Sequence, residues 1–402
     1  MTYRLITSTA ELAAACEAFA REEYLALDTE FMRESTYWPQ LCLAQIAGAH
    51  DTALIDPLAP GIDLAPLFEL LANPAVTKVL HAARQDLEIF LHLAGRLPTP
   101  LYDTQIAAMV CGFGDQVAYD SLVAKLTGKQ IDKGSRFTDW SVRPLSEKQL
   151  AYAADDVIHL RPAYERLKAK IERSGREEWV AEEMARLADP SVYVVDPQEA
   201  WRRLKPRGAK PQMLNVLREV AAFREIEARN RDIPRNRLIR DDALIEIAIR
   251  HPTTTEDLAR TRGVSQGLAN GSIGRGLIEA VERGLARPIR EAPQLEARPK
   301  LPPGIGPSVE LLKVLLRMRC ESHGVAARLV ASVDDLEQIA AFGEKGDTEA
   351  LRGWRRELFG EDALKLIRGE LALSIEKDQV MALPTPRGRA AEDHAETSPD
   401  AS

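Results

Sequence analysis

Residues 24–31, which read YLALDTEF, constrain the fold of this chain more than any other stretch. The first four residues are apolar and typical of a buried strand, and two carboxylates, Asp28 and Glu30, follow at alternate positions. Alternate side chains of a strand project from one face, so both acids point to the same place on a sheet. Buried carboxylates without a counter-charge are costly, and hard divalent cations take oxygen ligands. The stretch therefore predicts a metal site, with an exposed strand end as the alternative.

The tripeptide DTE occurs a second time, at residues 347–349, which allows an internal comparison. This copy follows Gly343 and Gly346 in a polar segment, and no apolar strand leads into it. We expect it to be a solvated loop or the start of a helix. The prediction of a metal site at Asp28 and Glu30 therefore depends on the apolar strand before them.

The length and composition indicate a cytoplasmic protein of several domains. A chain of 402 residues suggests two to four domains at roughly 100–200 residues each. The first residues do not resemble a signal peptide, and no apolar run approaches the roughly 18 residues that a membrane span needs. The four cysteines form no C-x-x-C pair, which argues against a zinc ribbon or a disulfide framework.

The chain has a net charge of −8 but contains one strongly basic segment. Twelve Lys and Arg residues against four Asp and Glu residues lie between Trp201 and Arg240. Such a local excess of positive charge can bind phosphates even in an acidic protein. The charge distribution therefore allows a nucleic-acid partner, and a solvated basic face is the alternative.

The first half of the chain predicts an α/β domain. A short strand and a capped helix open it, and three strands with tight links follow as an antiparallel meander. Helical patterning dominates from Asp103 to Leu187, which predicts a mixed sheet backed by helices. The expected strands lie at 24–31, 41–47, 52–56 and 76–80, and the expected helices before Asp103 lie within 8–19, 62–71 and 86–93.

Three more residues could contribute to a site with the two strand acids. Asp86 lies in HAARQD, after the predicted strand at 76–80, although an acid also suits the first turn of any helix. Tyr152 and Asp156 are four residues apart on a predicted helix and share a face, with Asp155 one step round. A tyrosine hydroxyl beside a carboxylate can orient a water at a metal. The alternative is a half-buried ring beside a solvated acid.

Together, the three clusters resemble the exonuclease motifs of the tyrosine-bearing branch of the DEDD superfamily. D-x-E on a strand, H-x4-D opening a helix and Y-x3-D on a later helix occur in that order. The longer strings LALDTEFMRE, YWPQLCLAQIA, VLHAARQDLEIF, LYDTQIA, SRFTDWSVRPLS and QLAYAADDV resemble the bacterial ribonuclease D family, to about residue 375. The resemblance implies an α/β ribonuclease-H-like exonuclease domain, a mixed sheet flanked by helices, followed by two small all-α HRDC-like domains.

The resemblance also implies the roles of the residues. Asp28, Glu30, Asp86 and Asp156 would hold two divalent metal ions, Mg²⁺ or Mn²⁺, with Asp28 bridging both and Asp86 acting through water. Tyr152 would hydrogen-bond the attacking water, and Glu30 would help to orient it. The implied activity is 3′→5′ hydrolysis of RNA by a monomer, which trims tRNA precursors and releases nucleoside 5′-monophosphates.

A wider set of residues is expected to contact the substrate. Tyr37 and Trp38 offer a stacking surface for an unpaired base, with a packed aromatic corner beside Pro39 as the alternative. His81 is expected to pack or hydrogen-bond locally rather than act as a base. The full set of expected substrate contacts is Arg33, Tyr37, Trp38, His81, Asp103, Arg136, Trp140, Arg231, Arg235 and Arg237.

Composition and a faint repeat divide the remainder of the chain. DALIEIA at 242–248 recurs as DDLEQIA at 334–340, each after a long apolar-periodic helix, which predicts two related helical domains. Thr255 is the expected cap of a helix at 253–259. The expected division is an exonuclease domain at 1–190, a linker at 191–210, an HRDC domain at 211–290, a linker at 291–303, a second HRDC-like domain at 304–375 and a disordered tail at 376–402.

An RNA-binding scaffold with an inactive nuclease domain is the alternative class of function. The complete set of four mutually repelling carboxylates argues against it, because RNA binding alone gains nothing from them. A helicase is excluded because the sequence contains no G-x-x-x-x-G-K-[ST] loop.

Overall fold

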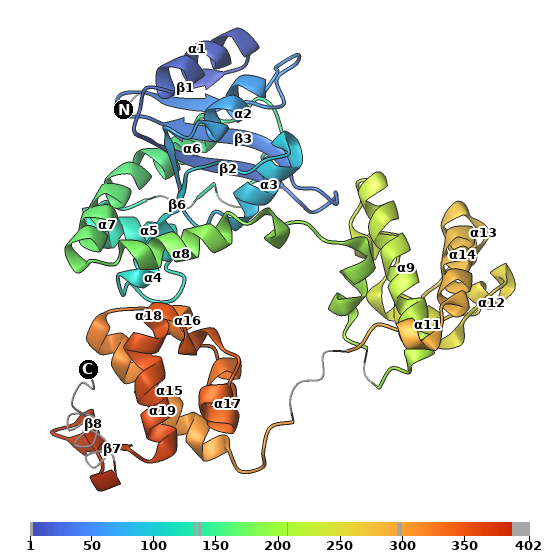
Figure 1. The fold of residues 1–402 in the computed structure, drawn as a ribbon. Helices are drawn as coiled ribbons and strands as arrows, with labels where there is room; N and C mark the ends of the chain where they lie inside the picture. Colours follow the sequence, from blue (N-terminus) through green and yellow to red (C-terminus); the bar gives the residue numbers. More distant parts are fainter. Residues whose placement is uncertain (1–2, 132–133, 136–137, 207, 296–299, 388–402) are drawn as a thin grey trace, which may run out of the picture.

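The computed structural model describes residues 3–131, 134–135, 138–206, 208–295 and 300–387. An α/β domain comes first, and two helical domains follow it (Figure 1). The α/β domain is built on a six-stranded mixed sheet with the strand order β1-β4-β3-β2-β5-β6. The strands are β1 (Tyr3–Ile6), β2 (Tyr24–Met32), β3 (Gln40–Ala47), β4 (Thr52–Ile55), β5 (Thr77–Leu80) and β6 (Leu101–Asp103).

The predicted antiparallel meander is confirmed. β2 pairs antiparallel with β3, and β3 pairs antiparallel with β4. β5 lies parallel to β2 on its other side, so β2 is an interior strand of the sheet. The three-residue strand β6, parallel to β5, was not predicted. Its three residues are too few to show a period-2 pattern.

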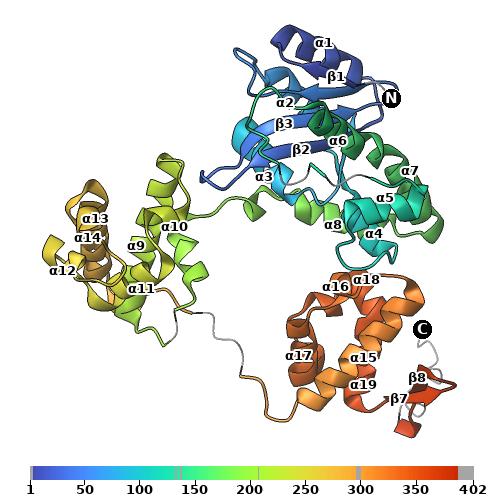
Figure 2. The same ribbon diagram turned by 180° about the vertical axis from the view of Figure 1, so that it is seen from behind.

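Helices cover both faces of the sheet, because alternate residues of the central strands are apolar on both faces. Leu25 and Leu27 of β2 pack beneath one set of helices, whereas Ala26 packs beneath the other. Figures 1 and 2 show these two faces. The first set is α1 (Thr9–Phe19), α2 (Ala65–Ala72) and α3 (Arg84–Ala94); α6 (Glu147–Ile158) and α7 (Leu160–Ser174) form the second, and α4 (Thr104–Val110), α5 (Tyr119–Thr127) and α8 (Glu177–Leu187) complete the domain.

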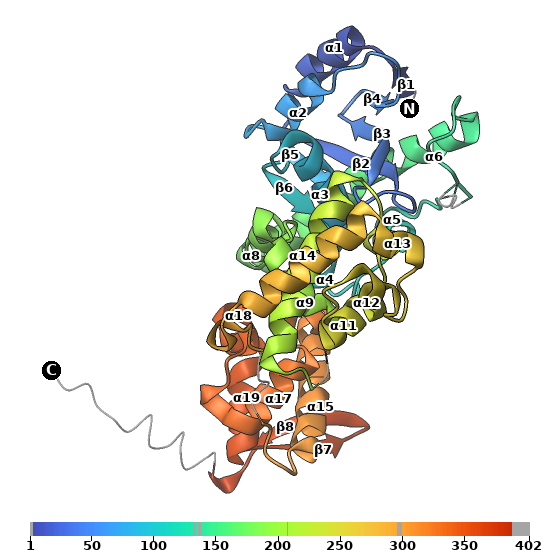
Figure 3. The same cartoon turned by 90° about the vertical axis from the view of Figure 1, so that its right-hand side faces the viewer.

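The first helical domain includes part of the segment predicted to be a linker. Trp201 is 1% exposed and packs with Leu204 against the long helix α9, so the predicted linker at 191–210 is wrong in its second half. α9 and α14 lie side by side (Figure 3). The short helix η1 (Pro190–Val192) lies in the linker, and the elements of the domain are η2 (Pro197–Leu204), α9 (Pro211–Asn230), α10 (Arg235–Leu238), α11 (Asp241–Arg250), α12 (Thr255–Ala259), α13 (Gln266–Asn270), α14 (Ser272–Ala286) and η3 (Ile289–Glu291). Thr254, and not the predicted Thr255, caps α12.

The second helical domain opens with the same succession of elements as the first. A long helix, a four-residue helix and a ten-residue helix follow one another in both, which agrees with the predicted repeat. Thr348 of the second DTE caps a short helix, as expected. The elements are α15 (Gly306–His323), α16 (Ala327–Val330), α17 (Val333–Phe342), η4 (Gly343–Lys345), η5 (Glu349–Leu351), α18 (Gly353–Arg355), η6 (Arg356–Gly360) and α19 (Glu361–Arg368).

A hairpin follows the second helical domain, where a disordered tail was predicted. β7 (Leu371–Glu376) and β8 (Gln379–Pro384) pair antiparallel. Lys377 and Asp378 form the turn, both with positive φ, a turn geometry whose twist matches that of the strands. The prediction of disorder from 376 is therefore wrong as far as residue 384, and the second domain is not entirely helical. Residues 388–402 lie outside the described part of the chain.

The second helical domain packs directly on the α/β domain. The rings of Trp179 and Trp354 stack with centroids 4.4 Å apart, and Arg355 donates to Glu182 at 2.7 Å. Gly112 has a positive φ, and a Cβ at this position would lie 2.6 Å from the carbonyl oxygen of Gly324. Glycine is therefore required at this contact. None of the helices described here combines the length and the apolar character that crossing a bilayer would require.

Candidate active site

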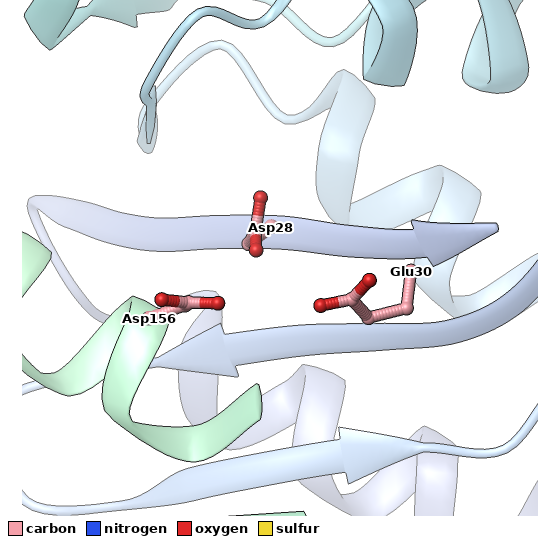
Figure 4. A group of neighbouring side chains, drawn as sticks. All are labelled: Asp28, Glu30 and Asp156. Atoms are coloured by element: carbon pink, nitrogen blue, oxygen red, sulfur yellow. The ribbon is translucent and has the colours of Figure 1, made fainter. Parts of the chain in front are cut away.

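Three carboxylates from two distant parts of the chain meet on one face of the sheet. Asp28 and Glu30 project from the same face of the interior strand β2, and Asp156 reaches them from α6 (Figure 4). One oxygen from each of the three lies within 4.8 Å of the others. The register of β2 and β3 shifts between Glu30 and Phe31, directly after the second acid.

The local structure of α6 explains which of its residues face the sheet. Ser146 and Gln149 form a capping box, which fixes the first turn of the helix. Tyr152 and Asp156 then fall on the sheet-facing side, whereas the side chain of Asp155 is 48% exposed and lies 3.8 Å from His159. Asp155 is therefore outside the carboxylate cluster.

Asp86 lies in the first turn of α3 and lines the same cavity as the other three acids. It is only 6% exposed and accepts a hydrogen bond from the hydroxyl of Thr29, the residue between the two acids of β2. The structure therefore brings Asp86 to the site, although it is not one of the three carboxylates within 4.8 Å.

The pKa of the central acid, Asp28, reports the repulsion among the acids. Burial raises the pKa of Asp28 well above its ordinary value, and the charges of Asp156, Asp86 and Glu30 raise it further. Burial also raises the pKa of Asp86 to about 7, although the Thr29 hydrogen bond opposes this shift. All the donors are carboxylate oxygens, which suit a hard divalent cation, and such a cation would relieve the mutual repulsion. The residues present therefore fit a divalent metal site.

The cavity over the cluster has a volume of about 810 Å³ and contains two tyrosines beside the acids. The pKa of Tyr152 is raised by burial and by the charges of Asp156 and Glu30, so its phenol stays protonated and can donate a hydrogen bond. The Tyr119 hydroxyl donates to the backbone carbonyl of Asp156. The sequence analysis missed Tyr119, because a tyrosine that opens a helix has no distinguishing pattern.

The expected substrate contacts near the cavity have structural partners. Both ring nitrogens of His81 are hydrogen-bonded, to the Thr104 hydroxyl at 3.0 Å and to the Val117 carbonyl at 3.1 Å. This agrees with the expectation that His81 hydrogen-bonds locally. Asp103 caps α4. Trp140, also expected to contact substrate, is only 2% exposed, because it packs beneath α6 with its ring 6.1 Å from that of Tyr152. Arg136 lies outside the described residues.

Tyr37 is not the stacking surface that was expected. It is 8% exposed, and its hydroxyl donates to Glu225 of α9 and accepts from Arg229 at 3.0 Å and Arg235 at 2.6 Å. The carboxylate of Asp232 accepts from the backbone N–H groups of Tyr37 and Trp38, each at 3.0 Å. The loop after β2 is thus part of the contact between the α/β domain and the first helical domain.

The remaining expected contacts are divided between this domain junction and the surface. The ring of Trp38 stacks on His92 with centroids 4.0 Å apart, and Arg33 pairs with Glu88 through two hydrogen bonds of 2.8 and 2.9 Å. Arg231 is exposed and bonds Glu227 on its own helix, and Arg237 is exposed. Arg235 therefore belongs to the domain contact, whereas Arg231 and Arg237 remain at the surface.

The comparisons with known proteins agree with this geometry. The 3′-5′ exonuclease family model matches residues 3–172, and the HRDC domain model matches residues 213–281. The chain is 51% identical over 380 residues to the ribonuclease D of Gluconacetobacter diazotrophicus, covering 94% of this chain and 96% of the relative. It is 52% identical over 377 residues to that of Nitrobacter hamburgensis, covering 94% and 98%.

A solved structure extends the likeness to the fold of nearly the whole chain. The crystal structure of Escherichia coli RNase D superposes with a TM-score of 0.78 at 34% identity, covering 92% of this chain and 99% of that one. The chain belongs to the ribonuclease D family and is a hydrolytic exoribonuclease.

Proposed function

We propose that this exoribonuclease trims the 3′ ends of structured RNA precursors, tRNA precursors among them, with two divalent metal ions, and releases nucleoside 5′-monophosphates. The convergence of Asp28, Glu30 and Asp156 within 4.8 Å in one cavity supports the use of metal. The E. coli relative is described as an exoribonuclease involved in structured RNA processing, which supports the class of substrate. Mg²⁺ and Mn²⁺ both suit an all-oxygen donor set.

We assign different roles in hydrolysis to the acids and to Tyr152. Asp28, Glu30 and Asp156 would hold the metal ions, and Asp86 would act on them through water. When bound, two such ions stabilise the charge that develops on the entering and leaving oxygens of the phosphodiester. The protonated phenol of Tyr152 lies on the same side of α6 as Asp156 and would orient the attacking water, together with Glu30. No covalent nucleophile is then needed.

The direct test is an incubation of the purified chain with a tRNA precursor that carries a 3′ extension. With Mg²⁺ we expect stepwise shortening from the 3′ end and release of nucleoside 5′-monophosphates. Chelation of the metal should stop the reaction, and added Mn²⁺ or Mg²⁺ should restore it. If the chain does not trim, or if Asp28→Ala trims as fast as the wild type, the proposal is wrong.

Replacing Tyr152 with Phe should lower kcat by about 10²–10³-fold, the usual cost of one hydrogen-bond donor at a reacting centre. KM should change little, because the phenol acts on the water and not on the bound RNA. Tyr24→Phe is the matched control, since it removes a phenol that bonds Glu165 outside the cavity. Equal rates for Tyr152→Phe and the control would refute the role of the Tyr152 hydroxyl.

A second cavity, of about 380 Å³, lies at the junction of the α/β domain and the first helical domain. Arg33 lines both cavities, so the two are neighbours. Among the described residues, Arg84 and Arg203 in the second cavity have no carboxylate partner. We propose that their charges contact the phosphates of the RNA before its 3′ end.

Removing one of these charges should weaken RNA binding without affecting the choice of sequence. Arg203→Ala is expected to lower the slope of log K against log salt concentration by about 1, the effect of one phosphate contact. The measurement is an equilibrium binding titration at several salt concentrations. Arg173→Ala removes an exposed arginine on α7 and is the control. An unchanged slope for Arg203→Ala would count against the contact.

A further inference from the structure

Gln45 has a buried side-chain amide for which the described residues provide no hydrogen-bond partner. It lies in the middle of β3 and is 0% exposed. Neither its side-chain nitrogen nor its side-chain oxygen has a hydrogen-bond partner among the described residues. Buried side-chain amides are nearly always paired, and an unpaired one lowers stability, so this residue needs an explanation.

The position of Gln45 in the sheet places it beside the acid cluster. It pairs directly with Asp28 across the antiparallel strands β2 and β3. Directly paired residues of an antiparallel sheet project from the same face, with Cβ atoms about 4.5–5.5 Å apart. Gln45 therefore lies on the same face as Asp28, and next to it.

The neighbours of Gln45 on its own strand show which part of α6 lies above it. Leu43 packs in one apolar cluster with Ala153, and Ala47 packs in another with Val157. Gln45 lies between these two residues of β3 and points the same way. Its amide is therefore beneath the turn of α6 that also carries Asp156.

An apolar residue would suit this position better if the fold alone determined it. The residues at Leu43 and Ala47 are apolar, and so is Leu54, which pairs with Gln45 from β4. Polar residues kept in a core at a cost in stability are expected at functional sites. The one acidic neighbour of Gln45 across the strand is Asp28, which points to a function through that carboxylate.

We propose that Gln45 is a positioning residue for the metal-binding carboxylates, and that its side-chain N–H, unpaired without metal, donates to the carboxylate of Asp28 once metal is bound. The side chain has three rotatable bonds, so the amide can turn toward Asp28 with no movement of the backbone. The donated hydrogen bond holds the carboxylate in the orientation that the metal needs, and an amide adds no further negative charge to a cluster of four acids. The inference rests on the proposed metal-dependent function.

The test compares Gln45→Met with the wild-type chain in metal binding and in stability. Loss of a hydrogen-bonding partner behind a metal ligand lowers metal affinity or activity by about 10–100-fold. We therefore expect Mn²⁺ affinity, measured by calorimetry without RNA, to fall by that factor. The Tm without metal should be equal to or higher than that of the wild type, because the unpaired amide is gone.

Thr52→Val is the matched control. The Thr52 hydroxyl is also fully buried and unpaired among the described residues, and Thr52 pairs with Ala47, two residues along β3 from Gln45. This variant should gain stability and keep the wild-type Mn²⁺ affinity. Gln45→Leu, a second apolar variant, should behave as Gln45→Met does.

Three outcomes would overturn the role of Gln45. These are a lower Tm for both Gln45 variants with unchanged Mn²⁺ affinity, unchanged values of both quantities, and an equal loss of affinity in Thr52→Val. If the wild-type chain itself bound no Mn²⁺ and trimmed no RNA, the proposed function would fail, and the role of Gln45 with it. If the wild type trims RNA and binds Mn²⁺, a negative result for the Gln45 variants contradicts only the role of Gln45 and not the proposed function.

Discussion

Asp28→Asn is expected to abolish RNA hydrolysis while making the metal-free protein more stable. Asp28 is the acid whose pKa is raised by the charges of all three of the others, so it lies at the centre of the cluster. Asparagine keeps its shape but removes its charge. Metal ions supply several kcal/mol of transition-state stabilisation, which is at least about a thousandfold in rate at ~1.4 kcal/mol per factor of ten.

The stability effect follows from the direction of the pKa shifts. A carboxyl group with a higher pKa in the folded than in the unfolded chain binds more protons when folded, so stability falls as the pH rises between the two values. For Asp86 that interval runs from 3.8 to about 7. The metal-free wild type should therefore lose stability toward neutral pH, and Asp28→Asn should lose less because one repelling charge is absent.

Thermal unfolding with and without Mg²⁺ measures both effects. The wild type should gain about 2.7 kcal/mol at a Mg²⁺ concentration 100 times its Kd, and Asp28→Asn should gain much less. Asp155→Asn is the control, since it removes a neighbouring, half-exposed acid outside the cluster and should leave the rate and the Mg²⁺ gain unchanged. Equal rates for Asp28→Asn and Asp155→Asn would disprove the assignment of the metal site.

The carboxylate cluster was foreseeable because the patterns that encode it are local. The apolar run before Asp28 predicts a buried strand, and the spacing of Asp28 and Glu30 sets their common face. The spacing of Tyr152 and Asp156 does the same on a helix. The meeting of strand and helix depends on the tertiary fold, so the sequence indicated it only through the resemblance to a family.

The partners of the basic residues were not foreseeable, because composition counts charges and does not pair them. The excess of arginine between Trp201 and Arg240 suggested phosphate contacts, yet Arg229 and Arg235 bond Glu225 in their own domain and Tyr37 across the domain boundary. Tyr37 is followed by Trp38, and two adjacent aromatic residues are also typical of an exposed stacking surface, so the sequence did not show that Tyr37 is buried. The local sequence around Tyr37 gives no sign of its contact with Glu225, Arg229 and Arg235, and the sequence around those residues gives no sign of Tyr37.

Similar reasons apply to the boundaries that were missed. Trp201 follows a proline-containing, polar stretch that is typical of a linker, and only the packing of its ring against α9 makes it part of a domain core. The hairpin β7–β8 turns at Lys377 and Asp378, which are not the Asn-Gly or Asp-Gly pair that usually marks such a turn. Its strands also carry exposed residues such as Ile375, so their alternation is weak.

Glu225→Ala is expected to release the first helical domain from the α/β domain. Glu225 is 1% exposed and is bonded by the Tyr37 hydroxyl, by Arg229 at 3.0 Å and by Arg235 at 2.7 Å. Its removal leaves Arg229 and Arg235 without their carboxylate partner, and the Tyr37 hydroxyl without its acceptor, in a buried contact. Breaking a buried ion pair from one side costs about 3–5 kcal/mol, so domain docking should be lost before either domain unfolds.

The pH dependence of the same contact has the opposite sign to that of the acid cluster. Burial opposes ionisation of Glu225, but hydrogen bonds from Arg235 and Tyr37 prevail and lower its pKa to about 2 from 4.5. A carboxyl group with a lowered folded pKa stabilises the contact above its unfolded pKa, and this stabilisation is lost as the pH falls. Wild-type docking should therefore weaken between pH 4.5 and about 2.

Calorimetry and small-angle scattering of the full chain can test this prediction. Glu225→Ala should show a separate early transition and a larger radius of gyration at neutral pH, and the wild type should reach the same state only in acid. Glu227→Ala is the control on the same helix, because its partner Arg231 is exposed and such pairs contribute only about 0.2–1 kcal/mol. A single unfolding transition for Glu225→Ala, at the wild-type temperature, would mean that docking depends on the apolar contacts of Tyr37 with Ala228 and Leu238 instead.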